Sequence, residues 1–210
     1  MEATFFEQPT LELAKALLGK YLIHEVDQRS VVGRIVEVEA YKGPEDRASH
    51  SFGGKRTQRT EVMFGPPGHA YFFLIYGMYH CFNVVSGATG KPEAILIRAL
   101  EPIEGIPFMI QQRFPKKYAE GLRKEENLTP RLKKQLTNGP GKLAQALGID
   151  QRYYGHDLKL PPLSIVEPPN RHTDSQLIIV RGSRINIAYA KEAIHYPWRF
   201  WIKNNPYVSQ

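Results

Sequence analysis

The sequence predicts one domain, residues 1–210, in which an antiparallel or mixed β-sheet is followed by helices. Three observations lead to this prediction. The 210 residues suit one substantial domain and contain neither an internal repeat nor a long linker. Alternating, β-branched and aromatic segments dominate residues 20–100, with turn-forming residues between them. Helix-start signals then follow in the second half, from residue 129 onward.

The first expected element is a helix over residues 11–18. Its leucine and alanine side chains recur at helical spacing, which predicts one apolar face packed on the core. The Thr10 hydroxyl can satisfy a free amide at the start of this helix. Gly19 can end it in a left-handed turn.

Four strands are expected next, over residues 31–41, 70–76, 79–86 and 94–100. Strict alternation in the first strand predicts two faces, because successive strand side chains point to opposite sides. One face would carry Ile35, Glu37, Glu39 and Tyr41. The other would carry Val36, Val38 and Ala40.

Helices are expected in the second half of the chain. Thr129 and Pro130 form a good helix start, and Leu132 and Leu136 would be its apolar stripe. Residues 138–142 then break the chain before a helix over residues 143–147, which Gly148 would end. The proline-rich residues 159–176 are expected to form a surface loop. Two further strands are expected around residues 177–180 and 199–203.

The charge of the chain favours a polyanionic partner. The net charge is +7, the pI is about 9.4, and residues 111–138 hold eight basic against three acidic side chains. Nucleic acid is the first expectation and an anionic membrane the second. No apolar run approaches the ~18–20 residues of a membrane span, and no basic amphipathic helix is long enough for a membrane surface. The start of the chain lacks the pattern of a signal peptide, so we expect a cytoplasmic protein.

Several kinds of site are absent from the sequence. Cys81 is the only cysteine, which excludes a disulfide scaffold and a cysteine-rich zinc site. The seven histidines form neither H-x-x-x-H nor H-E-x-x-H, and no Walker or G-x-S-x-G motif is present. No metal and no cofactor are therefore expected. Cys81 is interpreted as a small buried hydrophobic residue.

Glu37 and Glu39 form the first candidate constellation. They would lie about 7 Å apart on one strand face, and a carboxylate facing inward is costly unless it is paired or used. A carboxylate pair can serve acid–base chemistry such as glycosidic hydrolysis. The alternative is a solvated strand face with a salt bridge, which periodicity alone favours.

Aromatic side chains form the second candidate constellation. Tyr71, Phe72, Phe73, Tyr76 and Tyr79 fall within nine residues. Such rings can stack on nucleobases, although aromatic residues are also common in sheet cores. Tyr76 stands in what looks like a tight turn, from which a side chain could be wedged into a duplex.

The turn at residues 138–142, Asn-Gly-Pro-Gly-Lys, is the third candidate. Amides at a helix start with a lysine nearby can bind an anion such as phosphate. An ordinary turn between two helices is an equally good interpretation.

Several of these segments together resemble the alkyladenine (3-methyladenine) DNA glycosylase family, in a bacterial-type member. The resemblance runs from about Phe5 to Ser209 and rests on motifs in the same order. These motifs are Gly33 to Asp46, Ala48 to Ser51, Met63-Phe64, Tyr76 to Tyr79, Asn83, Arg98 to Pro102, Gly139 to Leu143, Arg199-Phe200 and Pro206 to Ser209.

The resemblance implies a single-domain α+β fold with a curved, largely antiparallel sheet flanked by short helices. It also implies a monofunctional base-excision repair enzyme in the bacterial cytosol that requires no protein partner, with a monomer as the default. The enzyme would flip alkylated or deaminated purines from duplex DNA and hydrolyse the N-glycosidic bond. The expected lesions are 3-methyladenine, 7-methylguanine, hypoxanthine and ethenoadenine. A non-catalytic damaged-DNA-binding protein is the alternative.

The resemblance also implies roles for particular residues. Glu39 would activate the attacking water and Arg98 would lie beside it. Tyr41, His50, Phe73, Asn83 and Tyr71 would line the base pocket. Tyr76, flanked by Met78, would intercalate into the duplex, and Gly141 and Lys142 would hold phosphate. Phe73 departs from the tyrosine of the best-known members, so stacking should persist while any hydrogen bond from that hydroxyl is lost.

Overall fold

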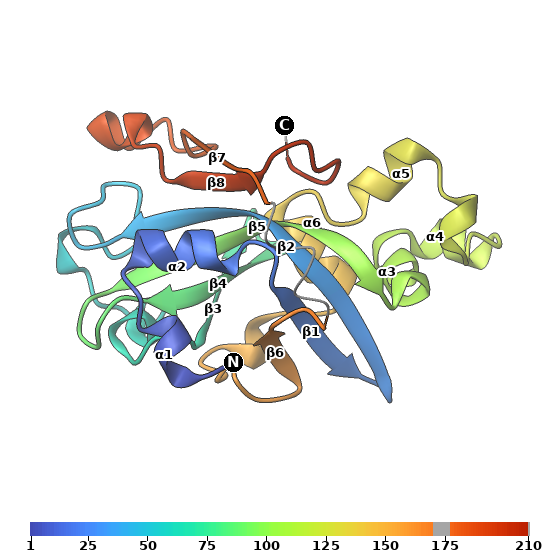
Figure 1. The fold of residues 1–210 in the computed structure, drawn as a ribbon, viewed down its shortest axis with the longest axis horizontal. Coiled ribbons are helices and arrows are strands. Elements are labelled where there is room, and N and C mark those ends of the chain that lie inside the picture. The colour runs from blue at the N-terminus through green and yellow to red at the C-terminus, as the bar shows by residue number, and fades with distance from the viewer. Residues whose placement is uncertain (170–176, 210) are drawn as a thin grey trace.

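The centre of the molecule is an eight-stranded antiparallel sheet, which curves between two sets of helices (Figure 1). The computed structural model describes residues 1–169 and 177–209. The strands are β1 (Tyr21–Val26), β2 (Arg29–Lys42), β3 (Ala70–Ile75), β4 (Tyr79–Ser86), β5 (Glu93–Glu104), β6 (Leu163–Val166), β7 (Ile179–Gly182) and β8 (Arg199–Ile202). Their order is β3–β4–β5–β2–β1–β6, with β8 joined to β2 and β7 joined to β8. This confirms the expected α+β fold with a curved, antiparallel sheet.

The long strand β2 connects the two halves of the sheet. Strand β5 runs along one edge of β2, whereas β1 and then β8 cover the other edge. A register shift at Val36 makes Ile35 oppose Leu100 and Glu37 oppose Ala99, which is the pattern of a β-bulge. Ile35 consequently joins Val36 in the main hydrophobic core. Its expected place on the face of Glu37 and Glu39 is wrong, because the bulge interrupts the alternation.

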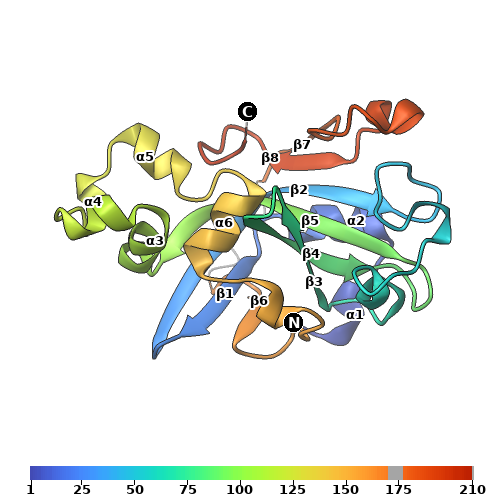
Figure 2. The ribbon, with the colours of Figure 1, turned by 180° about the vertical axis from the view of Figure 1, so that it is seen from behind.

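Helices lie on both sides of the sheet. They are α1 (Ala3–Phe6), α2 (Thr10–Leu17), α3 (Ile106–Arg113), α4 (Pro115–Ala119), α5 (Pro130–Gln135) and α6 (Pro140–Leu147). The two opposite views show α2 on one side and α6 on the other (Figures 1 and 2). Helices α3 to α5 project from one end of the sheet as a helical lobe, residues 106–135.

The expected helix ends are confirmed to within one residue, but two expected starts are wrong. Helix α6 begins at Pro140, within the residues expected to break the chain, because proline fits the first turn of a helix, and α2 begins at Thr10. The Thr129 side chain accepts the Leu132 N–H at 3.3 Å, and Gly148 ends α6 with a φ of +69°. Gly19 follows α2 with a φ of +90°. Thr10, however, does not cap α2. The helix begins directly after Pro9, and the buried Thr10 hydroxyl donates to the Glu93 carboxylate instead.

The last part of the chain contains more strand than expected. Strand β6 lies inside the proline-rich stretch 159–176 and pairs with β1, so the expectation of a loop is wrong there. Leu163 and Ile165 alternate into the core, which explains why this short run pairs with the sheet. Residues 170–176 of that stretch lie outside the described residues. Strands β7 and β8 confirm the two late strands, β7 beginning two residues later than expected.

Candidate active site

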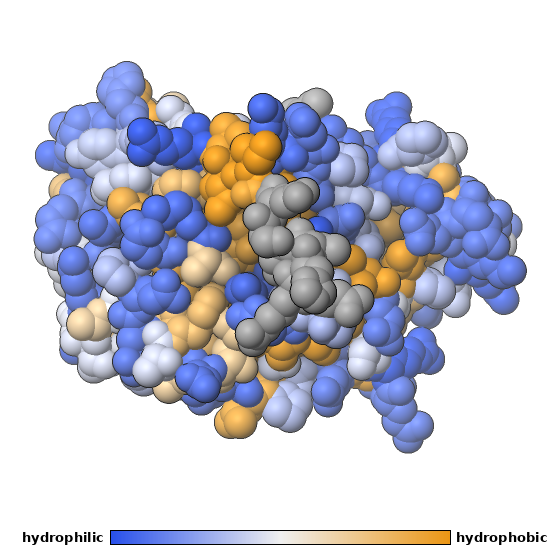
Figure 3. Space-filling view, viewed as in Figure 1, coloured by the Kyte–Doolittle hydropathy of each residue, from blue (hydrophilic) through white to orange (hydrophobic). Residues whose placement is uncertain are grey.

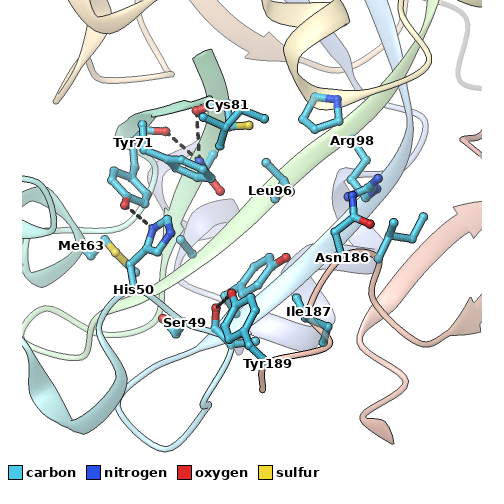
Figure 4. Close-up of a pocket in the computed structure, with 18 of the residues that line it drawn as sticks. Ser49, His50, Met63, Tyr71, Cys81, Leu96, Arg98, Asn186, Ile187 and Tyr189 are labelled. Carbon is cyan, nitrogen blue, oxygen red and sulfur yellow. Dashed lines mark hydrogen bonds between the residues drawn. The ribbon is translucent and has the colours of Figure 1, made fainter. Parts of the chain in front are cut away.

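A cavity of about 220 Å³ opens beside the sheet where residues of β2, β3, β4 and β5 meet two loops (Figure 4). The loops are residues 48–50 and 185–189. Seven of the expected site residues line this cavity. They are Tyr41, His50, Tyr71, Phe73, Tyr76, Asn83 and Arg98.

Glu39 is fully buried at the centre of β2, just behind the residues that line the cavity. One carboxylate oxygen accepts the Ile185 N–H at 2.8 Å and lies 3.4 Å from Nη1 of Arg98. The other accepts the Tyr41 hydroxyl at 2.7 Å. An ionised carboxylate offers about four acceptor positions, so these contacts leave room for one more donor such as water.

Glu37 is fully buried too, but its partners differ from those of Glu39. Its carboxylate accepts from Nε of Arg199 at 2.7 Å, and from the amide and hydroxyl of Ser209 at 2.6 and 2.8 Å. Nε of Arg98 lies 3.3 Å away. Arg98 thus stands between the two glutamates. Glu37 is held in a structural network and does not line the cavity.

Three rings form one wall of the cavity. Nδ1 of His50 lies 2.8 Å from the Tyr71 hydroxyl, and the His50 ring meets Phe73 edge to face at 4.5 Å between centroids. Burial, and secondarily the positive charge of Arg59, lower the pKa of His50 to about 4. Burial raises the pKa of Tyr71 to about 12. Both groups are therefore neutral at physiological pH, which suits a wall against which a nucleobase could stack.

Tyr41 on β2 and Asn83 on β4 are each held in a fixed orientation by their neighbours. Burial and the neighbouring Glu39 carboxylate raise the pKa of Tyr41, so its hydroxyl remains a donor. The Arg184 guanidinium lies over the Tyr41 ring at 4.7 Å. Asn83 donates its side-chain amide to the carbonyls of Tyr71 and Cys81 at 3.1 and 3.3 Å. Its amide oxygen is left as the acceptor for a bound ligand.

Tyr76 stands at the tip of the β3–β4 hairpin. Both Tyr76 and Gly77 have positive φ angles, +51° and +66°, and Met78 N–H closes the turn on Ile75 at 3.1 Å. This is a two-residue hairpin turn of the kind that matches strand twist. Tyr76 is 80% exposed and Met78 is 67% exposed. The hairpin therefore presents an aromatic side chain to solvent at the mouth of the cavity.

The start of α6 lies next to this hairpin, and only its first residue, Pro140, reaches the cavity. A Cβ added at Gly141 would come within 2.8 Å of Tyr79 Cβ, so glycine is needed for this close packing. Nζ of Lys142 contacts Oδ1 of Asn138 at 2.8 Å, and burial lowers the pKa of Lys142. Pro140 alone of this turn lines the cavity, whereas Gly141 and Met78 share an adjoining groove.

The basic segment, residues 111–138, does not reach the cavity. None of its residues lines the cavity, and most of it belongs to the helical lobe (Figure 1). The lobe is largely hydrophilic on the face seen in Figure 3. Within the segment, Arg113 is half-buried and holds the chain after α5. It donates to the carbonyls of Leu136 and Gln135 at 3.1 and 3.2 Å.

Sequence reasoning missed several residues that complete the site. Ile185 contributes only its backbone N–H, and Asn186 and Tyr189 line the cavity from the same loop. Asn186 takes a φ of +60°, a left-handed conformation that asparagine tolerates. Ser209 and Arg199 act through Glu37. The Ile185 N–H is a backbone donor, so no residue pattern could have marked it. Arg199 and Ser209 lie in motifs of the resemblance, but those motifs gave them no role in the site.

Two further features concern other chemistries. Burial raises the pKa of the Cys81 thiol to about 12, so this cavity residue is a neutral thiol. Within the described ranges, no group of three histidine, cysteine or acidic side chains is placed to hold a metal ion. No helix in the same ranges is long and apolar enough to cross a bilayer.

Comparison with known proteins identifies what this chain resembles. The family model for methylpurine-DNA glycosylase (MPG) matches residues 4–206. A protein of Bacillus cytotoxicus named "Putative 3-methyladenine DNA glycosylase" is 54% identical over 207 residues, 98% of this chain and 97% of that protein. A Bacillus cereus (strain G9842) protein of the same name is 53% identical over 208 residues, 99% of this chain and 97% of that protein.

Proposed function

Because this chain belongs to the methylpurine-DNA glycosylase family, a family of hydrolases that act on N-glycosidic bonds, we propose that it excises alkylated and deaminated purines from duplex DNA. The proposed lesions are 3-methyladenine, 7-methylguanine, hypoxanthine and ethenoadenine. One observation carries the proposal. A buried glutamate, Glu39, lies beside Arg98 behind an aromatic cavity, at whose edge an exposed tyrosine, Tyr76, stands on a tight turn.

The first proposed step takes the damaged nucleotide out of the duplex. Extruding a base costs a few kcal/mol, and least where damage has already weakened the pair. Tyr76 would offset part of that cost by filling the vacated stack, with Met78 flanking it. The positive φ of Tyr76 supports this role, because a turn of fixed geometry holds the ring outward without ordering a flexible loop.

Replacing Tyr76 by alanine is expected to weaken lesion capture. A stacked aromatic ring contributes about 1–3 kcal/mol per base, so the enzyme concentration for half-maximal single-turnover excision should rise roughly ten- to hundredfold. The substrate is a duplex with one hypoxanthine. Ile103→Ala, which removes an equally apolar exposed side chain at the far end of β5, should leave that concentration unchanged. If this concentration were the same for Tyr76→Ala and the wild type, the proposed intercalation of Tyr76 would be wrong.

The second proposed step holds the extruded purine between Tyr41 and Phe73. Alkylation at N3 or N7 gives the purine a positive charge, and aromatic faces attract a cation that a normal base does not carry. The Asn83 side chain would occupy the space that the exocyclic amine of an undamaged guanine needs, and so disfavour that base. These contacts would select damaged purines before any bond breaks.

The third proposed step is hydrolysis. Glu39 would orient a water and accept its proton while the water oxygen attacks C1′ of the sugar. The electrons of the N-glycosidic bond would leave with the purine. A cationic purine departs neutral, whereas a neutral lesion such as hypoxanthine departs as an anion that takes up a proton from solvent. The Glu39 charge would also favour the oxocarbenium-like transition state. Arg98, 3.4 Å from Glu39 and itself held by Glu37, would orient the carboxylate toward the water.

The proposed reaction stops at an abasic site. An enzyme that also cleaves the strand through an imine needs an amine nucleophile at the sugar. Among the described residues that line the cavity, none is a lysine. We therefore expect free base and an intact abasic strand in equal amounts.

Phosphate contacts are proposed for Lys142, Gly141 and the basic segment. Such contacts position the protein on DNA without reading sequence, and each makes binding more sensitive to salt. Lys142 lies beside the Tyr76 hairpin, which supports a contact near the lesion. The contact of Lys142 with Asn138 equally fits an ordinary helix turn.

Lys142→Ala separates these two interpretations. A lost phosphate contact should lower the slope of log binding constant against log salt concentration by about 0.9, measured on one duplex over several salt concentrations. Lys15→Ala is the matched control, because Lys15 is paired with Glu12 on α2, across the sheet from α6. An unchanged slope for Lys142→Ala would favour the ordinary turn.

A further inference from the structure

Arg59 lies directly behind the aromatic wall of the cavity, although no motif singles it out. Its Nη2 is 2.7 Å from Nε2 and 3.2 Å from Nδ1 of His50. Its guanidinium lies over the Phe73 ring at 5.1 Å from the centroid. Arg59 is not among the lining residues, so it touches the wall without occupying the cavity.

These contacts disfavour a charged His50. Nη2 of Arg59 lies within 3.2 Å of both ring nitrogens, so the guanidinium faces the ring and places its positive charge against the imidazole. On Nδ1, the Tyr71 hydroxyl lies 2.8 Å away and can either donate or accept. A doubly protonated His50 would place an N–H against the Arg59 guanidinium, with like charges in contact.

We propose that Arg59 is a positioning residue that disfavours protonation of His50 and so helps the cavity to accept a cationic purine in mildly acidic as well as neutral solution. The selectivity part of this inference rests on the proposed glycosylase function. The part that concerns the charge of His50 does not.

The positive charge of Arg59 has a different effect from a charge on His50. Arg59 is an exposed residue, so water and salt screen its guanidinium, and Phe73 lies against it. His50 lines the cavity itself, in a poorly solvated place where a charge acts strongly. A protonated His50 would repel a cationic base that stacks on the same wall, whereas Arg59 prevents that protonation from outside.

Other groups around His50 do not take over this role. The Tyr71 hydroxyl on β3 and the Cys81 thiol on β4 both have pKa values raised to about 12 by burial, so neither is charged near neutral pH. On the far side of the cavity, Arg98 on β5 and Glu39 on β2 are paired with each other. Arg59 is accordingly the charged side chain that contacts His50 among the described residues.

The first experiment follows the His50 imidazole in the free protein by NMR titration, with His50→Gln to assign its signal. In the wild type, burial and Arg59 hold the His50 pKa at about 4, so His50 should stay neutral through pH 5.5. Arg59→Met should raise the His50 pKa toward, but not to, its usual 6.5, because burial remains the larger cause. Arg59→Lys, which keeps the charge, should stay near the wild type. Equal titration in Arg59→Met and the wild type would overturn the inference.

The second experiment compares cationic 7-methylguanine with neutral hypoxanthine in single-turnover excision at pH 5.5 and 7.5. In Arg59→Met, the ratio of the two second-order rate constants should fall by up to about 1.5-fold at pH 5.5 and should not change at pH 7.5, because burial keeps most His50 neutral even without Arg59. The loss should lie in the half-saturating concentration, because the positive charge on the purine fades as the base leaves. Comparing Arg59→Met with the wild type at each pH removes effects of pH on the other groups, since the two enzymes share them.

Matched variants separate this inference from a merely structural role. Arg56→Met removes an equally exposed arginine from the same segment, one that pairs with Glu61, and should change neither experiment. Equal losses on both substrates at both pH values in Arg59→Met would show a structural role and refute the selectivity. If the wild type released no base at all, the proposed function and the selectivity would fail together, while the NMR titration would still decide the charge of His50.

Discussion

Glu39→Gln is expected to abolish base release nearly completely while leaving DNA binding almost intact. Glutamine keeps the size of the side chain and can still accept the Ile185 N–H through its amide oxygen, but it cannot take a proton from water. Loss of a general base typically lowers a rate by roughly 10²–10⁴-fold. The measurement is single-turnover release from a hypoxanthine duplex, with affinity for the same duplex determined in parallel.

A thermal unfolding curve for Glu39→Gln provides the control for this result. Glutamine weakens the ion pair with Arg98, but Arg98 keeps the Glu37 carboxylate as a partner, so we expect only a modest loss of stability. A variant that is folded, binds DNA and still releases base at the wild-type rate would remove Glu39 from the proposed role. The alternative position, Glu37, would then need the same test, although its carboxylate is already occupied by Arg199 and Ser209.

Asp46→Asn is expected to have the second-largest effect, on stability as well as on excision. Asp46 and Arg184 are both fully buried, with Nη2 of Arg184 2.8 Å from Oδ1 of Asp46. Removing one partner leaves a buried charge uncompensated, which typically costs about 3–5 kcal/mol of unfolding free energy. Arg184 directly precedes Ile185, whose N–H holds Glu39. Excision by the molecules that remain folded should therefore slow as well.

Denaturant unfolding and single-turnover excision measure the two effects of Asp46→Asn. The matched control is Glu192→Gln, because the exposed Glu192–Arg47 pair joins the same two segments of chain at the surface. Such exposed pairs contribute little to stability, so this control should be close to the wild type in both measurements. If Asp46→Asn were as stable as Glu192→Gln, the buried pair would not hold the loop in the way described.

Local patterns predicted much of the fold. The β3–β4 hairpin followed from two aromatic runs around Gly77, and β4 has the expected bounds. Helix α5 followed from proline at its start and the end of α6 from Gly148, whereas the start of α6 was placed three residues too late. Strand β6 was missed because four residues among prolines carry too weak a pattern to oppose the turn signals. The bulge at Val36 was invisible because it depends on the register with β5.

The site residues that act through their own side chains could be predicted from the sequence. The resemblance named Tyr41, His50 and Arg98, and these residues do line one cavity. It did not show what holds them in place. The Ile185 amide reaches Glu39 across 146 residues of sequence, and the Ser209 amide reaches Glu37 across 172. Only the assembled sheet brings β7, β8 and the chain end beside β2, so no local pattern could reveal these contacts.

The aromatic cluster, too, was predictable only in part from the sequence. Phe72 packs in the main core, as the ordinary interpretation of a sheet predicted. Its neighbours Tyr71 and Phe73 line the cavity, and Tyr76 is exposed beyond them. Alternation along β3 separates core from cavity. The exposure of Tyr76, however, depends on the hairpin turn.

The most direct test of the central claim is product analysis after the wild-type protein has acted on three duplexes. One carries hypoxanthine, one carries ethenoadenine, and one is methylated DNA that can release 3-methyladenine. The account predicts free base and abasic sites in equal amounts from damaged DNA, with no strand break and almost no release by Glu39→Gln. Tight binding to all three duplexes without release of any base would contradict it and leave a damaged-DNA-binding protein.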